Sequence, residues 1–434
     1  MTPVDRWDTA NIGHVRRAPE NFLSESDIRA VRAGRRDFLR ASLLGLGSVM
    51  SGHLAAQETG DAAILELPPW STSAGQPVAA RPYGQPSQYE NDKQRLSIPG
   101  LSLFGGNSAS FTPLQSLFGI ITPSGLHYER HHQGWHDIDP ARHRLMINGS
   151  GPGMLKKPRV YTIPELLRLP SVSRILFLEC GGNTAMEWAG PTMPTVQYTH
   201  GWLSCSEFTG VPLRLLLEDC GVDYRKARYV LAEGADGASL TRTIPMEMVE
   251  SGEVFLAYGQ NGEMLRPENG YPLRLVVPGV QGVSWVKWLR RIEVGDQPYA
   301  TREETLHYVD LMPDGQLRQY TSIQECKSVI TTPSGGQQLL NTGFYNVTGL
   351  AWSGRGAIER VDVSFDGGDN WRTARLETPL LDKALTRFST DWVWDGSPAV
   401  LQSRAIDSTG YVQPGMRELR AVRGTQSIYH NNAI

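Results

Sequence analysis

The chain has 434 residues, of which 40% are hydrophobic and 20% charged, with 45 Gly, 28 Pro and a formal net charge of −3. This composition is typical of a loop-rich soluble β or α+β protein and excludes a coiled coil or a disordered chain. The near-neutral charge excludes the strongly basic surface of a nucleic-acid-binding protein, and no segment after residue 56 is long and apolar enough to span a bilayer.

Residues 1–56 are predicted to be a twin-arginine export signal. Arg35 and Arg36 lie in GRRDFLR at 34–40, a short apolar run follows at 41–50, and HLAAQ at 53–57 offers a cleavage site after Ala56. This route carries folded proteins, which often hold a cofactor, so the signal predicts a periplasmic protein and favours a redox cofactor. The alternative is a basic amphipathic helix that stays attached.

Two regions follow the signal before the composition changes. Residues 57–95 are rich in Pro, Gln, Ser and Gly, and this pattern predicts an extended arm. Residues 96–332 alternate short apolar runs with short helical patterns, which predicts a mixed α+β domain. The predicted strands are 174–178 and 273–277, and the predicted helices are 161–169, which has Thr162 as its cap and Pro164 near its start, and 213–219.

Residues 333–434 are predicted to form a second, all-β domain with a C-terminal tail. DGGDN at 366–370 is typical of a hairpin turn, because glycine adopts positive φ without strain. Short strands separated by turns over about 90 residues predict an immunoglobulin-like β-sandwich. The predicted strands are 344–352, 358–365, 371–376 and 399–407.

The four cysteines do not form a C-x-x-C pair or the C-x-x-C-H motif of haem attachment. A disulfide between Cys205 and Cys220 is an alternative in an oxidising compartment, but we expect both thiols to be buried. Cys326 lies more than 100 residues after Cys220, the nearest cysteine in the sequence. Cys180 differs because a predicted strand runs into it and Gly-Gly-Asn follows. A soft thiolate beside glycines, which let a large group approach the backbone, suits a metal or cofactor ligand. On these residues alone, however, a buried cysteine beside a tight turn is the favoured interpretation.

Five of the ten histidines lie in HYERHHQGWHDIDPARHR at 127–144. His132 and His136 have the spacing of a helical zinc pair, but Gly134 and the DIDP run argue against a helix, and no Glu lies between them to act as a base. Arg130 offers a planar fork for an oxyanion, to which imidazoles add donors. The segment therefore predicts an anion-binding turn in preference to a zinc site.

Several stretches in combination resemble the sulfite oxidase family of molybdenum enzymes. They are FLECGGNTAMEW at 177–188, VLAEGAD at 230–236, RPENGYPLRLVVPGVQGVSWVK at 266–287, SIQECKSVITTP at 322–333, FDGGDNW at 365–371 and AIDSTGYVQP at 405–414. The resemblance covers about residues 97–424. It implies an α+β fold with a molybdopterin-binding domain at 96–332 and an immunoglobulin-like dimerisation domain at 333–434. Within the family, the chain is most similar to the sulfane-oxidising branch of the Sox thiosulfate-oxidising systems.

The resemblance also implies roles for individual residues. Cys180 is the expected protein ligand to molybdenum, and Arg130, Tyr308 and Arg423 are the expected catalytic residues of the substrate pocket. Tyr198 is expected where sulfite-oxidising relatives place a tryptophan, and Ala185 replaces an arginine that contacts sulfite or sulfate in those relatives. The expected cofactor-binding residues are Tyr128, Arg130, His131, His132, Cys180, Asp236, Asn269, Arg274, Trp285, Val286 and Lys287.

The implied reaction is molybdenum–molybdopterin-dependent oxidation of sulfane sulfur on a carrier protein, by oxygen-atom transfer from an oxo group on Mo(VI). Because the chain has no haem-binding motif, we expect no haem in it, and electrons should pass to a separate c-type cytochrome subunit in a hetero-complex that contains a homodimer of this chain. The loss of a cation at Ala185 favours a carrier-bound substrate over a free dianion. The alternatives are a dehydrogenase for free sulfite, a reductase for substrates such as sulfoxides, and a scaffold subunit without a cofactor.

Overall fold

The computed structural model describes residue 84 and residues 86–98, 108–188, 193–311, 317–319 and 323–423. The predicted export signal at 1–56 and most of the predicted arm at 57–95 therefore lie outside the described residues. Within the arm, Ser87 caps a short 3₁₀ turn, η2 (Gln88–Glu90), by accepting a hydrogen bond from the Tyr89 amide at 3.3 Å.

The histidine-rich segment begins in a small antiparallel sheet of three strands. Ala109 pairs with Arg130 and Ser108 with His131, so the Arg–His pair lies on a strand and not on a helix. The expectation that the i, i+4 histidines are not helical is confirmed, because 132–139 contains no helical residue. The strands are β1 (Leu96–Ile98), β2 (Ser108–Phe111) and β3 (Glu129–His131).

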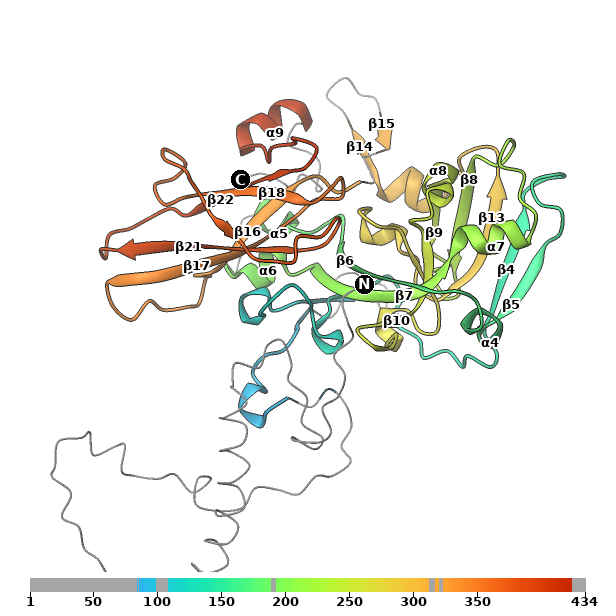
Figure 1. Cartoon of the computed structure of the whole chain (residues 1–434), viewed down its shortest axis with the longest axis horizontal. Helices are drawn as coiled ribbons and strands as arrows, with labels where there is room; N and C mark the ends of the chain where they lie inside the picture. Colours follow the sequence, from blue (N-terminus) through green and yellow to red (C-terminus); the bar gives the residue numbers. More distant parts are fainter. Residues whose placement is uncertain are drawn as a thin grey trace, which may run out of the picture. The chain divides into compact units, whose positions relative to one another are not determined.

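Two larger sheets form the domain that carries the predicted site (Figure 1). One has the order β5-β4-β13-β8-β9, in which β4 and β13 are parallel, and the other has the order β11-β10-β7-β6, with β12 also paired to β10. The predicted strands at 174–178 and 273–277 are confirmed as β6 and β12. The bounds are β4 (Arg144–Gly149), β5 (Arg159–Thr162), β6 (Val172–Glu179), β7 (Leu203–Pro212), β8 (Tyr229–Gly234), β9 (Thr241–Pro245), β10 (Phe255–Gln260), β11 (Glu263–Met264), β12 (Arg274–Val276) and β13 (Leu289–Gly295).

Short helices connect these strands, and the sequence signals for two of them are confirmed. Thr162 forms a capping box with Glu165 at the start of α4 (Ile163–Leu167), and α7 (Leu213–Asp219) has the predicted bounds. A capping box supplies partners for backbone amides that the first helical turn leaves unpaired. The other helical elements are η3 (Leu114–Ser116), η4 (Ser124–Leu126), α5 (Ala185–Trp188), α6 (Val196–His200), α8 (Met246–Glu250), η5 (Pro267–Asn269), η6 (Gly282–Ser284) and the π-helix η7 (Glu303–His307), with strands β14 (Val309–Leu311) and β15 (Leu317–Gln319) after it.

The C-terminal domain is a β-sandwich, as predicted, with sheets in the orders β16-β17-β21-β20 and β19-β18-β22. Ala374 is buried between the two halves of the strand expected at 371–376, which passes from one sheet to the other. β16 lies before residue 333 but pairs with β17, so the sandwich includes it. The bounds are β16 (Lys327–Thr332), β17 (Gly343–Trp352), β18 (Ile358–Ser364), β19 (Arg372–Thr373), β20 (Arg375–Leu376), β21 (Thr386–Trp394), β22 (Gln402–Asp407) and α9 (Met416–Arg423).

The two domains share a buried apolar cluster. Phe177 and Leu203, from the paired strands β6 and β7, pack with Leu350 and Trp352 of β17. Two polar contacts add to this interface: Lys383 pairs with Glu253 at 2.6 Å, and Arg387 donates to the carbonyls of Leu117 and Gly119 at 2.9 and 2.8 Å. Side chains that are separated widely in the sequence therefore fix one domain on the other.

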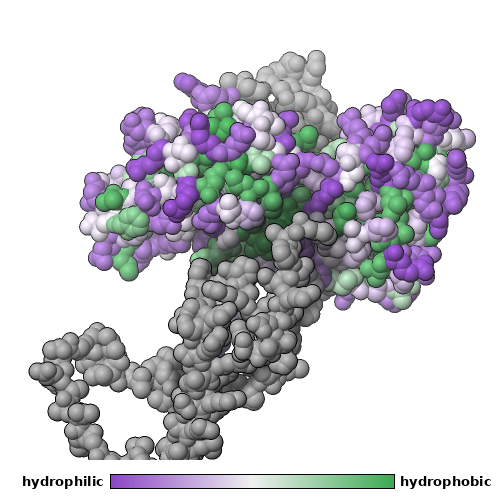
Figure 2. All heavy atoms as spheres, in the orientation of Figure 1, coloured by the Kyte–Doolittle hydropathy of each residue, from purple (hydrophilic) through white to green (hydrophobic). Residues whose placement is uncertain are grey.

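Figure 2 shows polar residues over much of the visible surface, with apolar side chains gathered near its middle. In the described part of the chain, no helix has both the length and the apolar character needed to cross a membrane. The expected burial of Cys205 and Cys220 is confirmed, and both are free thiols.

Candidate active site

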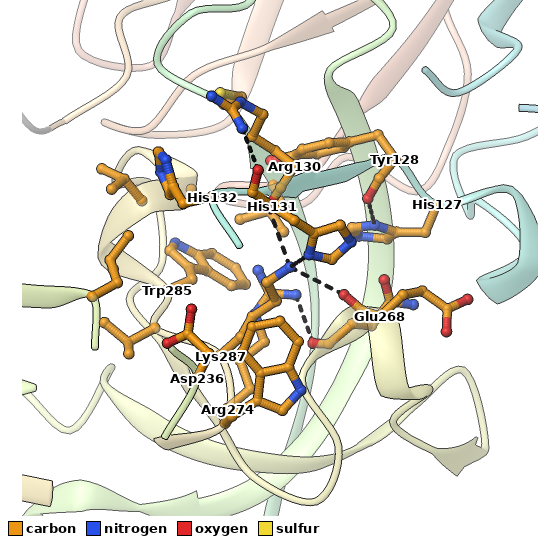
Figure 3. Close-up of a pocket in the computed structure, with 18 of the residues that line it drawn as sticks. His127, Tyr128, Arg130, His131, His132, Asp236, Glu268, Arg274, Trp285 and Lys287 are labelled. Atoms are coloured by element: carbon orange, nitrogen blue, oxygen red, sulfur yellow. Dashed lines mark hydrogen bonds between the residues drawn. The ribbon is translucent and has the colours of Figure 1, made fainter. Parts of the chain in front are cut away.

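A pocket opens where the end of β6 meets β3 and the loops around β12. It encloses about 700 Å³ of space, including the solvent at its open mouth. Figure 3 shows Arg130, Trp285, Lys287 and Arg274 arranged around one pocket, with Lys287 near its centre. The lining residues are His127, Tyr128, Arg130, His131, His132, Leu178, Cys180, Asp236, Leu240, Glu268, Asn269, Arg274, Gly282, Val283, Trp285, Val286, Lys287, Trp288 and Tyr308.

Cys180 is placed in the pocket by the turn that ends β6. Its amide donates to Trp202 O at 3.0 Å, and its carbonyl accepts from the Asn183 amide at 2.9 Å. Thr184 completes the turn with a φ of 69°, in the left-handed region. Burial raises the pKa of the Cys180 thiol, and the nearby charge of Arg130 partly offsets this rise. The thiol is therefore protonated at neutral pH unless a metal or another cation stabilises the thiolate.

Within the described residues, no group of three or more His, Cys, Asp or Glu side chains is arranged to hold a metal ion. His132 lines the pocket, whereas the His136 ring packs edge-on against Trp288, with ring centres 5.7 Å apart. Among the described residues, Cys180 is thus not part of a cluster of such side chains that could hold a metal by itself. This donor set agrees with a metal that arrives already bound in a cofactor.

Arg274 is a buried cation with incomplete hydrogen bonding. Its side chain is 5% exposed; Nη1 donates to Asn269 O at 3.1 Å, while Nε has no partner. The Asn269 side-chain nitrogen, also buried, has no partner either. Burial lowers the pKa of Arg274 to about 10. Unpaired buried donors are unfavourable, so these two groups suit an anionic group such as the phosphate of a pyranopterin.

Lys287 is held in the middle of the pocket by three acceptors. Its Nζ donates to Glu268 O at 3.1 Å, to Arg130 O at 3.3 Å and to His131 Nδ1 at 2.8 Å. Burial, and then the charge of Arg274, lower the pKa of Lys287 to about 7. Its ammonium is therefore only partly protonated at pH 7, and an anionic ligand would favour the protonated form.

His131 links Lys287 to a carboxylate. Burial and the charge of Lys287 lower the pKa of His131 to about 4, so the ring is neutral at pH 7. Because Nδ1 accepts from Lys287, Nε2 carries the proton and donates to Glu129 at 2.8 Å. Glu129 in turn forms an ion pair with Arg95. The histidine thus serves as a fixed spacer that orients the Lys287 ammonium.

Tyr308 lies at the end of the π-helix η7, an element often found at functional sites. The guanidinium of Arg242 lies 5.1 Å from the centre of its ring, close enough for a cation–π interaction. Arg242 is 4% exposed, and its Nε lies 3.8 Å from Glu304. Arg242 was not predicted as a site residue, because an arginine on a strand carries no local sign of burial.

Twelve of the predicted site residues line this single pocket: Tyr128, Arg130, His131, His132, Cys180, Asp236, Asn269, Arg274, Trp285, Val286, Lys287 and Tyr308. Tyr198 is not among the lining residues; it packs against Phe111 with ring centres 5.7 Å apart. Arg423 is the last residue of α9, and its side chain is outside the described part of the structure.

Seven of the lining residues were not predicted as site residues from the sequence. Of these, His127 is buried, its pKa is lowered to about 3 mainly by burial, and its Nε2 has no partner. Gly282 permits a close approach of chains: a Cβ there would lie 2.8 Å from Tyr128 Oη and 3.0 Å from Glu179 O. The clustering of histidines was the signal that could have included His127; nothing local marks Leu178, Leu240, Glu268, Gly282, Val283 or Trp288.

Comparisons with known proteins agree with this arrangement. The family model for the oxidoreductase molybdopterin binding domain matches residues 132–303, and that for the Mo-co oxidoreductase dimerisation domain matches 318–434. Sulfite oxidase from Gallus gallus is 30% identical over 344 residues, which cover 73% of each chain. The chain therefore belongs to the sulfite oxidase family of molybdopterin oxidoreductases, and this membership implies a molybdenum–molybdopterin cofactor.

One solved structure shows a more specific similarity within this family. The crystal structure of the sulfane dehydrogenase SoxCD from Paracoccus pantotrophus matches with a TM-score of 0.82 and 47% identity, covering 86% of this chain and 95% of that one. The chain is thus similar to a sulfane dehydrogenase. It is also 33% identical to a nitrate reductase [NADH] from Solanum lycopersicum over 320 residues, but it spans only 34% of the length of that protein.

Proposed function

We propose that this chain is the molybdenum-containing subunit of a sulfane dehydrogenase, which oxidises sulfane sulfur held on a carrier protein. The observation that carries the proposal is that Cys180 and Arg130 line the same pocket as the buried cations Arg274 and Lys287. The 47% identity to the Paracoccus pantotrophus sulfane dehydrogenase supports this choice of substrate.

The residues of the pocket have separate tasks in this proposal. Cys180 ligates the metal, while Arg274, Asn269 and Lys287 hold the anionic end of the pterin. When bound, the cofactor supplies two-electron oxygen-atom transfer. Arg130 stabilises negative charge that develops on the substrate, because preorganised donors in a site that excludes water are effective at this. Arg423 is proposed as a second arginine with the same task.

The substrate preference rests on a missing cation. Ala185, the first residue of α5, occupies the place where sulfite-oxidising relatives are expected to have an arginine. Each lost charge-assisted hydrogen bond weakens binding by about 1.5–3 kcal/mol. A free sulfite dianion depends on such bonds for its affinity, whereas a carrier protein also binds through its own surface. Carrier-bound sulfur is therefore the favoured substrate.

We also propose partners and a location for the enzyme. Electrons pass to a separate c-type cytochrome, since the chain has no C-x-x-C-H motif. A homodimer forms through the sandwich domain, where Phe344 and Val393 face each other across β17 and β21 and are 65% and 73% exposed. The protein is exported to the periplasm; replacing Arg35 and Arg36 with Lys should leave it in the cytoplasm, and continued export would contradict that assignment.

The decisive experiment is purification from the native periplasm with measurement of molybdenum, haem and turnover. About one molybdenum per chain, a copurifying c-type cytochrome and faster turnover of carrier-bound sulfane sulfur than of sulfite are expected. Preparations without molybdenum would indicate a scaffold subunit instead. The similarity to the Gallus gallus enzyme favours a second candidate, a dehydrogenase for free sulfite, which a higher kcat/KM for sulfite than for the carrier would support.

A further inference from the structure

Glu179 is a fully buried carboxylate next to the proposed metal ligand, yet it does not line the pocket. Leu178 and Cys180 line the pocket, and Glu179 between them is 0% exposed. Because side chains alternate along a strand, Glu179 points from the end of β6 to the opposite face. The carboxylate is therefore directed away from the cofactor site and toward other parts of the protein.

Three donors from side chains bind this carboxylate. Lys327 Nζ and Asn183 Nδ2 donate to Oε1 at 2.9 and 3.0 Å, and Trp352 Nε1 donates to Oε2 at 3.0 Å. The Lys327 side chain is 3% exposed, so the ion pair is buried on both sides. Such short contacts in a dry environment fix the position of both partners.

Two of the three donors come from the sandwich domain. Lys327 begins β16 and Trp352 ends β17, and these residues are directly opposite each other in the register of the two strands. They are separated from Glu179 by 148 and 173 positions in the sequence. One cross-strand pair of the second domain thus forms hydrogen bonds with Glu179, the residue that precedes Cys180.

The third donor connects the carboxylate to the turn that carries Cys180. Asn183 donates to Glu179 through Nδ2 and accepts from the Trp202 amide through Oδ1 at 3.1 Å. Trp202 O accepts from the Cys180 amide at 3.0 Å, and Cys180 O accepts from the Asn183 amide at 2.9 Å. The peptide groups on both sides of Cys180 are therefore linked to the Glu179 carboxylate through a closed set of hydrogen bonds.

We propose that Glu179, Lys327 and Trp352 are positioning residues for the Cys180 ligand, through which the sandwich domain completes the metal site. The inference rests on the proposed function, since it takes Cys180 as the metal ligand. Desolvation offsets much of the attraction within a buried ion pair, so its main effect here is on geometry. Interactions behind a metal ligand control its orientation, and their loss typically lowers affinity or activity by about 10–100-fold.

The test compares Glu179→Gln and Trp352→Phe with a matched control, Lys383→Met. Lys383 and Glu253 also form an ion pair between the two domains, at 2.6 Å, through side chains that are not among the hydrogen-bond partners described for the Cys180 turn. The Lys383 carbonyl accepts from the Phe177 amide of β6 at 2.9 Å, and a side-chain substitution keeps that backbone bond. The readouts are the Mo(V) electron paramagnetic resonance spectrum, which is sensitive to the geometry of the cysteine ligand, and kcat and KM measured separately on molybdenum-loaded protein.

Glu179→Gln should change the spectrum and lower kcat by about 10–100-fold with KM nearly unchanged, while Lys383→Met should leave both as in the wild type. Wild-type spectra and kcat in both Glu179→Gln and Trp352→Phe would overturn the inference. If a variant takes up no molybdenum, alkylation of Cys180 in cofactor-free protein replaces the spectrum: a faster rate than in Lys383→Met supports the inference, and an equal rate refutes it. Absence of molybdenum from wild-type protein would instead refute the proposed function.

Discussion

Replacing Arg274 with Met should stabilise the cofactor-free protein and weaken its hold on the cofactor. Burial lowers the pKa of Arg274 from 12.5 to about 10, which corresponds to roughly 3 kcal/mol against the charged form. Met removes this penalty, but it also removes the hydrogen bond to Asn269 O and the contact with the Trp285 ring, together about 1–2 kcal/mol. The free energy of unfolding of the cofactor-free protein should therefore rise by roughly 1–2 kcal/mol.

The same substitution removes charge-assisted hydrogen bonds to the anionic end of the cofactor. Each is worth about 1.5–3 kcal/mol, so affinity should fall by about 10–150-fold. Urea unfolding of cofactor-free protein and molybdenum content after maturation in limiting molybdate measure the two effects. Arg387→Met is the control, because Arg387 is buried but has backbone partners outside the pocket; it should lose stability and keep molybdenum. Lower stability with normal molybdenum content in Arg274→Met would refute this reasoning.

Three further substitutions test other parts of the site. Cys180→Ser should abolish turnover and lower molybdenum content while the protein still folds, because a hydroxyl is a poor ligand for a soft metal. The control Cys205→Ala should keep normal turnover and molybdenum content. Full activity in Cys180→Ser would contradict the ligand assignment. Ala185→Arg should lower KM for free sulfite by about tenfold or more if the missing cation determines substrate choice, and an unchanged KM would contradict this. Lys287→Met should alter the pH dependence of stability in the cofactor-free protein. The pKa of Lys287 is about 7 in the folded protein, against an ordinary value of 10.5 for an exposed lysine. Between pH 7 and pH 10.5 the unfolded chain therefore binds one more proton than the folded protein. The free energy of unfolding of the wild type should consequently rise with pH across this range, by up to roughly 4–5 kcal/mol. Urea unfolding at pH 7, 8.5 and 10 should show this rise in the wild type and not in the variant, and equal slopes would contradict the assignment.

Signals within a few residues predicted much of the local structure. Thr162 and Pro164 mark the start of a helix whatever surrounds it, and glycines at 367 and 368 have the positive φ of the predicted hairpin turn. The strand β21 was not predicted, because it begins with TRFS at 386–389, which has no apolar run, although all four of these residues are buried. Burial on both faces of a strand depends on the packing of other elements, which a short window does not contain.

The candidate site shows the same difference between features with a local sequence signal and features that depend on long-range packing. Cys180 and Arg130 stand in unusual local sequences, and the family resemblance then identified their neighbours in the pocket. Glu179 and Arg242 stand in ordinary strand sequences, and their significance depends on partners far along the chain. The Glu179 carboxylate meets Lys327 only after both domains have formed, and Arg242 meets the Tyr308 ring only through the π-helix. Long-range pairing of this kind leaves no trace in residue order.

The apolar cluster between the domains also determines the order in which the protein can mature. Phe177 and Leu203 leave the ribosome long before Trp352 and Leu385, which cover them in the folded protein. Until then the nascent first domain presents an apolar surface that invites aggregation or binding by a chaperone. The turn at residue 180 acquires its final support only when the sandwich docks. Insertion of the cofactor should consequently follow completion of translation, so the last quarter of the chain controls when the enzyme becomes a metalloprotein.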